Sequence, residues 1–175
     1  DAGAGNIGAV KDLGIARDDR EEITFFVQKA MDAGADIIVT LGGASVGDHD
    51  LVNHVLTDLG IELDFWKIAM RPGKPLMFGK LGKTRCLGLP GNPVSSLICS
   101  HLFLKPLVRA LAGLPPVSCE RDAVLDVPMP ANDGRQDYVR AYVVKQDGIF
   151  HATPFATQDS SMLRTLADAN AAIIR

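Results

Sequence analysis

The chain has 175 residues, of which 47% are hydrophobic and 22% charged, as in a soluble globular protein of one large or two small domains. Its net charge of −3 hides an uneven distribution: residues 1–64 sum to −9, residues 65–118 carry eight bases and no acid, and residues 119–175 sum to −2. The acid-free segment predicts an anion-binding surface, whereas the acidic segments around it argue against a nucleic-acid partner.

The sequence also argues against a membrane or secreted protein. The longest uncharged run, Cys86–Leu104, is broken by a Pro-Gly-Asn-Pro turn, and no basic stretch precedes an apolar segment at the N-terminus. The three cysteines are too widely spaced for a disulfide framework or a zinc knuckle. We therefore expect a cytoplasmic location.

The first half predicts alternating helices and strands. Acidic residues 18–22 precede an amphipathic pattern that ends near Gly34, which indicates a helix. The apolar run Asp36–Leu41 is typical of a buried strand, and residues 51–60 predict a short helix. Further strands are predicted over 63–68, 76–78 and 85–89, before a long apolar helix from about Val94 to Leu111.

This order predicts an α/β fold with an open, mostly parallel sheet between two helix layers, in which ligands bind at the carboxyl ends of the strands. After Gly113–Pro116 the pattern alternates with period two, and Asp133-Gly134 and Asp147-Gly148 supply turn signals. We expect one domain over residues 1–114 and a small all-β domain over residues 117–175.

Three loops at predicted strand ends are candidate binding sites. The first combines glycines that permit an anion-binding backbone with a hydroxyl and two carboxylates: Gly42, Gly43, Gly47, Ser45, Asp48 and Asp50. Asp48 and Asp50 suit Mg²⁺, whose preferred ligands are oxygens, or alternatively cap the next helix.

The second loop places Lys67, Arg71 and Lys74 on a backbone stiffened by prolines. A stiff cationic loop suits an oxyanion because little conformational entropy is lost on binding, although a solvated basic hairpin gives the same pattern. The third loop joins a strand to a helix start and includes Pro90, Gly91, Asn92 and Ser95. It suits a phosphate at the helix N-terminus, or alternatively is an ordinary turn with proline at the helix start and glycine in the turn.

The three loops together resemble a known family. Leu41–Asp50, Phe65–Pro75 and Gly88–Ser95 resemble three signature segments of the molybdopterin molybdenumtransferases, the family of MoeA and the gephyrin E domain, and residues 12–19 also resemble it. The Leu-Pro-Gly-Asn-Pro turn and the Ser-Val-Gly loop favour this family over the molybdopterin adenylyltransferases, which share its fold.

The resemblance implies a molybdopterin-binding α/β domain followed by a small C-terminal β-barrel domain. It also implies the reaction, in which molybdate is inserted into adenylylated molybdopterin and AMP is released with the help of Mg²⁺. Because members of the family carry further domains, we expect this chain to be a fragment that is incomplete at both ends.

The resemblance assigns roles residue by residue. Asp50 and Lys67 match functional residues, and Arg71 stands where the family often has lysine, so these three are the candidate catalytic residues. The glycine loop, Lys74 and the third loop match the cofactor-binding positions, joined by three residues of the second domain: Arg135, Arg140 and Ser161. Asp137 belongs to the same matching segment as Arg135 and Arg140, which faces the cleft in the family. Asp50, with Asp48, is the candidate metal ligand.

The family also implies a homodimer and a molybdopterin adenylyltransferase as a partner. Two other functions remain open at this point. The chain could be a molybdopterin adenylyltransferase, or a module that binds molybdopterin or scaffolds a partner without turnover.

Overall fold

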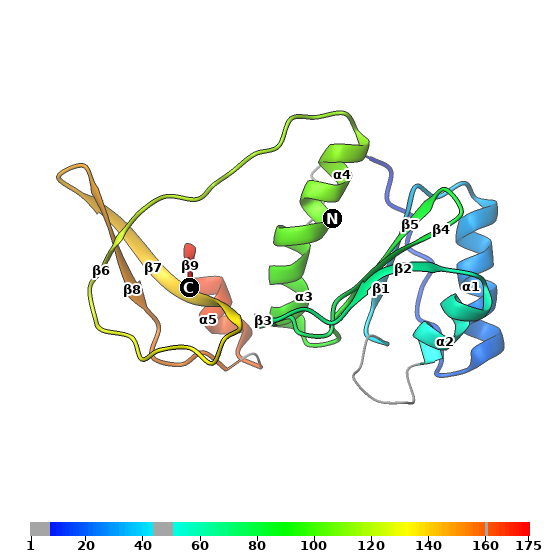
Figure 1. Ribbon diagram of the computed structural model, residues 1–175, viewed down its shortest axis with the longest axis horizontal. Helices are drawn as coiled ribbons and strands as arrows, with labels where there is room; N and C mark the ends of the chain where they lie inside the picture. Colours follow the sequence, from blue (N-terminus) through cyan, green and yellow to red (C-terminus); the bar gives the residue numbers. More distant parts are fainter. Residues whose placement is uncertain (1–7, 44–50, 160) are drawn as a thin grey trace.

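The computed structural model describes residues 8–43, 51–159 and 161–175 (Figure 1). The first group of elements is α1 (Arg20–Asp32), β1 (Ile37–Leu41), α2 (Leu51–Asp58), β2 (Glu62–Trp66), β3 (Met70–Arg71), β4 (Met77–Leu81), β5 (Thr84–Leu89), α3 (Pro93–Cys99), the π-helical turn η1 (Ser100–Leu104) and α4 (Lys105–Leu111). The second group is β6 (Val124–Leu125), β7 (Gln136–Gln146), β8 (Ile149–Pro154), α5 (Leu163–Asp168) and β9 (Ala171–Ile174).

Helices cover both faces of the first sheet (Figure 1). On one face α1 and α2 bury Ile23, Val27, Val55 and Leu56 in one core cluster, and on the other α3 buries Val94 in a second cluster. The start of α1 is as predicted, because the Asp19 carboxylate accepts a hydrogen bond from the backbone N–H of Glu22. The predicted α/β class is confirmed.

The strand order in this sheet is β1-β5-β4-β2. Strands β1 and β5 are parallel, whereas β4 pairs antiparallel with both β5 and β2. The expected mostly parallel arrangement therefore applies only to the pair β1–β5. The reason is local: only Gly82 and Lys83 connect β4 to β5, and so short a turn can join only antiparallel strands.

The long apolar helix forms where it was predicted, but it contains a π-helical turn at its centre. By length and composition alone, the stretch Pro93–Leu111 could cross a membrane, a test that the core helix of a soluble protein also passes. Its first turns pack into the core, since Val94, Ile98 and Cys99 are buried.

The second group of elements forms a sheet in the order β3-β7-β8-β6, with β9 on the other side of β7. The predicted turn at Asp147-Gly148 connects β7 to β8, and both residues have positive φ, as tight hairpins require. This region is mainly β, as expected, and it adds one short helix, α5, whose Thr165 is buried.

Strand β3 belongs to the first group in sequence but to the second sheet in space. Met70 pairs with Gln136 and Arg71 with Asp137, in parallel register, and the Gln136 N–H donates to the Ala69 carbonyl at 2.9 Å. The cationic loop of the α/β unit is thus bonded directly to β7.

Candidate functional site

A pocket of about 430 Å³ lies where β1 and β5 end. Gly42 follows β1 and donates to the carbonyl of Leu89, the last residue of β5. The lining residues come from the first and third loops and from the end of the cationic loop: Gly42, Gly43, Pro75, Pro90, Gly91, Asn92 and Ser95. The three loops that the sequence singled out therefore meet at one place, as the parallel pair β1–β5 requires.

Two glycines allow the first and third loops to approach closely. A Cβ added to Gly91 would lie 3.4 Å from the Cα of Gly42, and Gly42 has a φ of +82° that side chains other than glycine rarely adopt. Gly43 also has positive φ, at +71°. This part of the pocket is therefore walled by bare backbone.

The helix start in the pocket is largely capped by the protein itself. The Asn92 side-chain oxygen accepts hydrogen bonds from the N–H of Ser95 at 3.2 Å and from its hydroxyl at 3.3 Å. Pro93, the first helical residue, has no N–H to offer. None of the residues that line the pocket in the described part of the chain is charged. The pocket thus suits a flat, neutral, hydrogen-bonding group better than a phosphate.

Lys67 is held in an unusual backbone conformation beside this pocket. Its φ is +81°, and its N–H donates to the Leu76 carbonyl at 2.9 Å. The ammonium lies 4.7 Å from the centre of the Trp66 ring, a cation–π contact. A non-glycine residue with positive φ carries strain, which structures retain mainly at functional sites.

The loop from Met70 to Pro75 is anchored at its middle. Gly73 is buried against the side chains of Cys99 and Met70, whereas the neighbouring Lys74 is exposed. Since Pro75 lines the pocket, the loop presents its cations next to the uncharged pocket rather than inside it.

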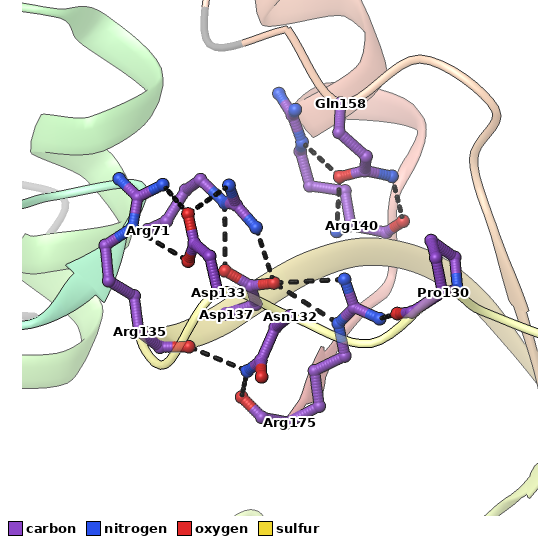
Figure 2. A network of polar contacts seen from close by, with 9 residues as sticks. All are labelled: Arg71, Pro130, Asn132, Asp133, Arg135, Asp137, Arg140, Gln158 and Arg175. Carbon is purple, nitrogen blue, oxygen red and sulfur yellow. Dashed lines mark hydrogen bonds and ion pairs between the residues drawn. The ribbon is translucent and has the colours of Figure 1, made fainter.

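Arg71 is bound by a buried carboxylate (Figure 2). Its Nε and Nη2 atoms donate to the two oxygens of Asp137 at 2.9 and 2.8 Å, and its Nη1 lies 3.5 Å from Asp133. Arg175 donates to Asp137 from the opposite side, through Nε at 3.2 Å and Nη2 at 3.1 Å. The hydrogen bond from Arg71, foremost, lowers the pKa of Asp137 below its ordinary value.

Asp133 has its own arginine partner. Arg135 donates to it through Nε at 3.0 Å and through Nη2, and this pairing lowers the Asp133 pKa to about 2. Three guanidinium groups therefore surround two carboxylates, which leaves a net charge of +1 in the cluster (Figure 2).

Arg140 lies apart from the open face of this cluster, with only 2% of its surface exposed. Its Nε donates to the Gln158 side chain at 3.2 Å, and its Nη1 to the Asp159 carbonyl at 2.9 Å. Burial, above all, lowers its pKa. Asp159 in turn accepts from the Ser161 N–H at 2.8 Å. Arg140 thus holds the turn that carries Ser161.

Several predicted residues lie outside the described part of the chain, namely Ser45, Gly47, Asp48 and Asp50. Among the described residues, no group of three or more acidic, histidine or cysteine side chains is placed to hold a metal ion. The metal-ligand prediction for Asp48 and Asp50 therefore stays a prediction.

The sequence placed Asp137 in a segment that resembles the family's cleft-facing one, but it gave no specific role to Asp137 and none to Arg175. One signal was available, since Asp137, Val139 and Ala141 alternate along a strand and share its buried face. A carboxylate on an otherwise apolar face requires a cationic partner, because burying an unpaired charge is costly. The pattern does not show which arginines would provide it.

Two family profiles match the chain. Residues 4–110 match a profile described as "Probable molybdopterin binding domain", and residues 122–175 match one described as "MoeA C-terminal region (domain IV)".

Two curated bacterial proteins are similar to this chain over most of its length. The "Molybdopterin molybdenumtransferase" of Haemophilus influenzae is 34% identical over 94% of this chain and 41% of its own length, and that of Bacillus subtilis is 36% identical over 93% and 38%. A solved structure of a molybdopterin biosynthesis MoeA protein from Pyrococcus horikosii has 28% identity and a TM-score of 0.69, over 93% of this chain and 38% of that one. The chain thus spans about two fifths of these relatives.

Proposed function

Because this chain belongs to the family of molybdopterin-binding domains and carries a MoeA C-terminal region, we propose that it provides the transfer site of a molybdopterin molybdenumtransferase. The reaction is the insertion of molybdate into adenylylated molybdopterin, with release of AMP. Relatives that are 34% and 36% identical bear that name, which supports the proposal.

The arrangement of the pocket and the cationic loop carries the proposal. Its uncharged walls, formed by Gly42, Gly91 and Asn92, suit the flat neutral pterin ring. The exposed Lys67, Arg71 and Lys74 beside it suit the phosphate and molybdate, which are both anions. One substrate with a neutral ring and an anionic tail would bind across both parts.

Mg²⁺ fits the residues between Gly43 and the start of α2 at Leu51. Asp48 and Asp50 supply the carboxylate oxygens that Mg²⁺ prefers, and we propose that they hold it. A bound Mg²⁺ would offset negative charge on the phosphates.

The protein's own contribution is electrostatic. We propose that Lys67 and Arg71 donate hydrogen bonds to the oxyanions, while Gly43 and Ser45 present backbone and hydroxyl donors. No side chain needs to act as a covalent nucleophile, because the dithiolene sulfurs of the substrate are the ligands of molybdenum. Arg135 and Ser161 would approach the same anions from the second sheet, with Arg140 holding Ser161 in place through Asp159.

The test is molybdate-dependent release of AMP from adenylylated molybdopterin by the full-length protein under anaerobic conditions. We expect Asp50→Ala to abolish release without unfolding the protein. Asp64→Ala, which removes an exposed carboxylate on β2, is the matched control and should leave release unchanged. Normal turnover in Asp50→Ala would contradict the role of Asp50.

Two other outcomes identify different functions. Formation of adenylylated molybdopterin from ATP and molybdopterin would indicate an adenylyltransferase. Tight binding of molybdopterin without AMP release would indicate a binding or scaffolding module.

The same proposal includes a cytoplasmic homodimer that receives its substrate from a molybdopterin adenylyltransferase. An apolar groove between Phe65, Phe78, Phe103 and Leu107 supports a contact between copies along the long helix. Sedimentation of the full-length protein would give its oligomeric state.

A further inference from the structure

We propose that Asp137 is a positioning residue that holds the Arg71 guanidinium toward the oxyanions of the substrate. This inference rests on the proposed function, because it assigns Asp137 to the orientation of the cation that the reaction uses.

The first support is that Asp137 is placed between two arginines by the strand register. Arg71 lies opposite Asp137 in the parallel pair β3–β7. On the other side of β7, Asp137 and Arg175 exchange both backbone hydrogen bonds, at 2.9 and 3.1 Å. One buried carboxylate, 2% exposed, therefore receives a guanidinium from each side (Figure 2).

The second support is the geometry of the clamp on Arg71. Asp137 engages the edge formed by Nε and Nη2, which uses two of the five guanidinium N–H groups. The side chain of Arg71 is still 46% exposed. Its outer N–H groups are thus left to bind an oxyanion, while the bidentate pair fixes the plane of the group. Asp133, at 3.5 Å from Nη1, is 52% exposed and holds it less firmly.

The third support is the charge balance. Asp137 neutralises one of its two arginine partners, so the group of three residues remains cationic. The second arginine keeps Asp137 ionised and in place when Arg71 turns its remaining donors to a ligand.

The clamp in this chain depends on the arginine fork, although the family often has lysine at this position. A lysine at position 71 would offer one ammonium in place of the planar fork, and could not both bind Asp137 in two places and present a defined outer edge. We therefore expect that in Arg71→Lys the side chain keeps its positive charge but is no longer held in a defined orientation toward the oxyanion.

The experiment is a double-mutant cycle on the full-length protein. Single variants Asp137→Asn and Arg71→Ala and the double variant are compared in kcat/KM for molybdate-dependent AMP release. We expect each single variant to lose about tenfold or more, as for a lost charge-assisted hydrogen bond, and the double variant to lose no more than Arg71→Ala alone. Losses that multiply in the double variant would overturn the proposal.

A second measurement does not depend on turnover. Hydrogen exchange at the Arg71 Nε–H, followed by NMR, should be slow in the wild type and at least about tenfold faster in Asp137→Asn, since that group loses its ionised acceptor. Asp147→Asn makes the same substitution in the exposed turn between β7 and β8 and is the matched control, with exchange and kcat/KM unchanged.

The outcomes separate the two claims. Unchanged exchange in Asp137→Asn would overturn the positioning role, whatever the activity. Absence of AMP release from the wild type would contradict the proposed function, while the exchange rates would still decide whether Asp137 holds Arg71. If Asp137→Asn does not fold, Arg71→Lys provides the test, and wild-type kcat/KM in that variant would contradict the proposal.

Discussion

Gly73 and Cys99 are in direct contact: a Cβ added to Gly73 would lie 2.6 Å from the Sγ of Cys99 and 2.9 Å from the Cε of Met70. Gly73 also has a φ of +117°. The cationic loop is therefore seated on α3 through a position where no side chain fits. This contact anchors the segment that carries Arg71 and Lys74.

Gly73→Ala should accordingly be strongly destabilising. Overpacking and the positive φ together predict a loss of about 3 kcal/mol in the free energy of unfolding. Gly82→Ala is the matched control, because Gly82 has a φ of +60° but no atom within 4 Å of the added Cβ. It should lose only about 1 kcal/mol. Equal losses in denaturant titrations of the two variants would show that the contact with Cys99 is unimportant.

Two substitutions at Lys67 should lower activity equally but differ in their effect on stability. Lys67→Gly and Lys67→Ala both remove the ammonium, so both should lower kcat/KM about tenfold or more. Glycine tolerates the φ of +81°, whereas alanine does not. Lys67→Gly should therefore be more stable than Lys67→Ala by about 1 kcal/mol, as measured by thermal unfolding. A glycine variant less stable than the alanine variant would argue against stored strain.

The Asp137 cluster should contribute to stability at neutral pH and less in acid. The folded-state pKa of Asp137 is below its ordinary value of 3.8, so the stabilisation is present above that value and is lost as pH falls through the folded pKa. Asp137→Asn should be less stable than the wild type at about pH 6, with the difference shrinking below about pH 4. Denaturant titrations across this range provide the measurement.

Asp133 titrates below the pH range of that comparison. Its pairing with Arg135, foremost, lowers its pKa to about 2. If the difference in the free energy of unfolding between wild type and Asp137→Asn stays constant from about pH 6 to about pH 3, the ion pair is not its source.

The local features of this fold could be predicted from the sequence. The acidic residues before Arg20 and the apolar stripe through Ile23 and Val27 specify α1 by themselves. The apolar run of β1 and the Asn92-Pro93 helix start are equally local, which is why the meeting of the loops at one pocket was predictable. The expected burial of β1 was wrong, because within this strand only Ile38 is buried, whereas Val39 and Leu41 are exposed.

The relationships between distant segments were not predictable. Met70 and Arg71 look like loop residues, and they form β3 only because β7, more than sixty residues later, offers its edge. The register that places Arg71 opposite Asp137 depends on how the second sheet packs, which no local pattern encodes.

The central claim is that the pterin ring binds in the pocket that Gly42 and Gly91 help to line, and one substitution tests it directly. A valine at position 91 places its Cβ about 3.4 Å from the Cα of Gly42 and adds a branched side chain to a residue that lines the pocket. Gly8→Val is the matched control, since a Cβ at Gly8 meets no atom within 4 Å. The measurement is the Kd of molybdopterin for the full-length protein by anaerobic calorimetry. We predict that Gly91→Val raises this Kd about tenfold or more while Gly8→Val leaves it unchanged, and an unchanged Kd in folded Gly91→Val would contradict the account.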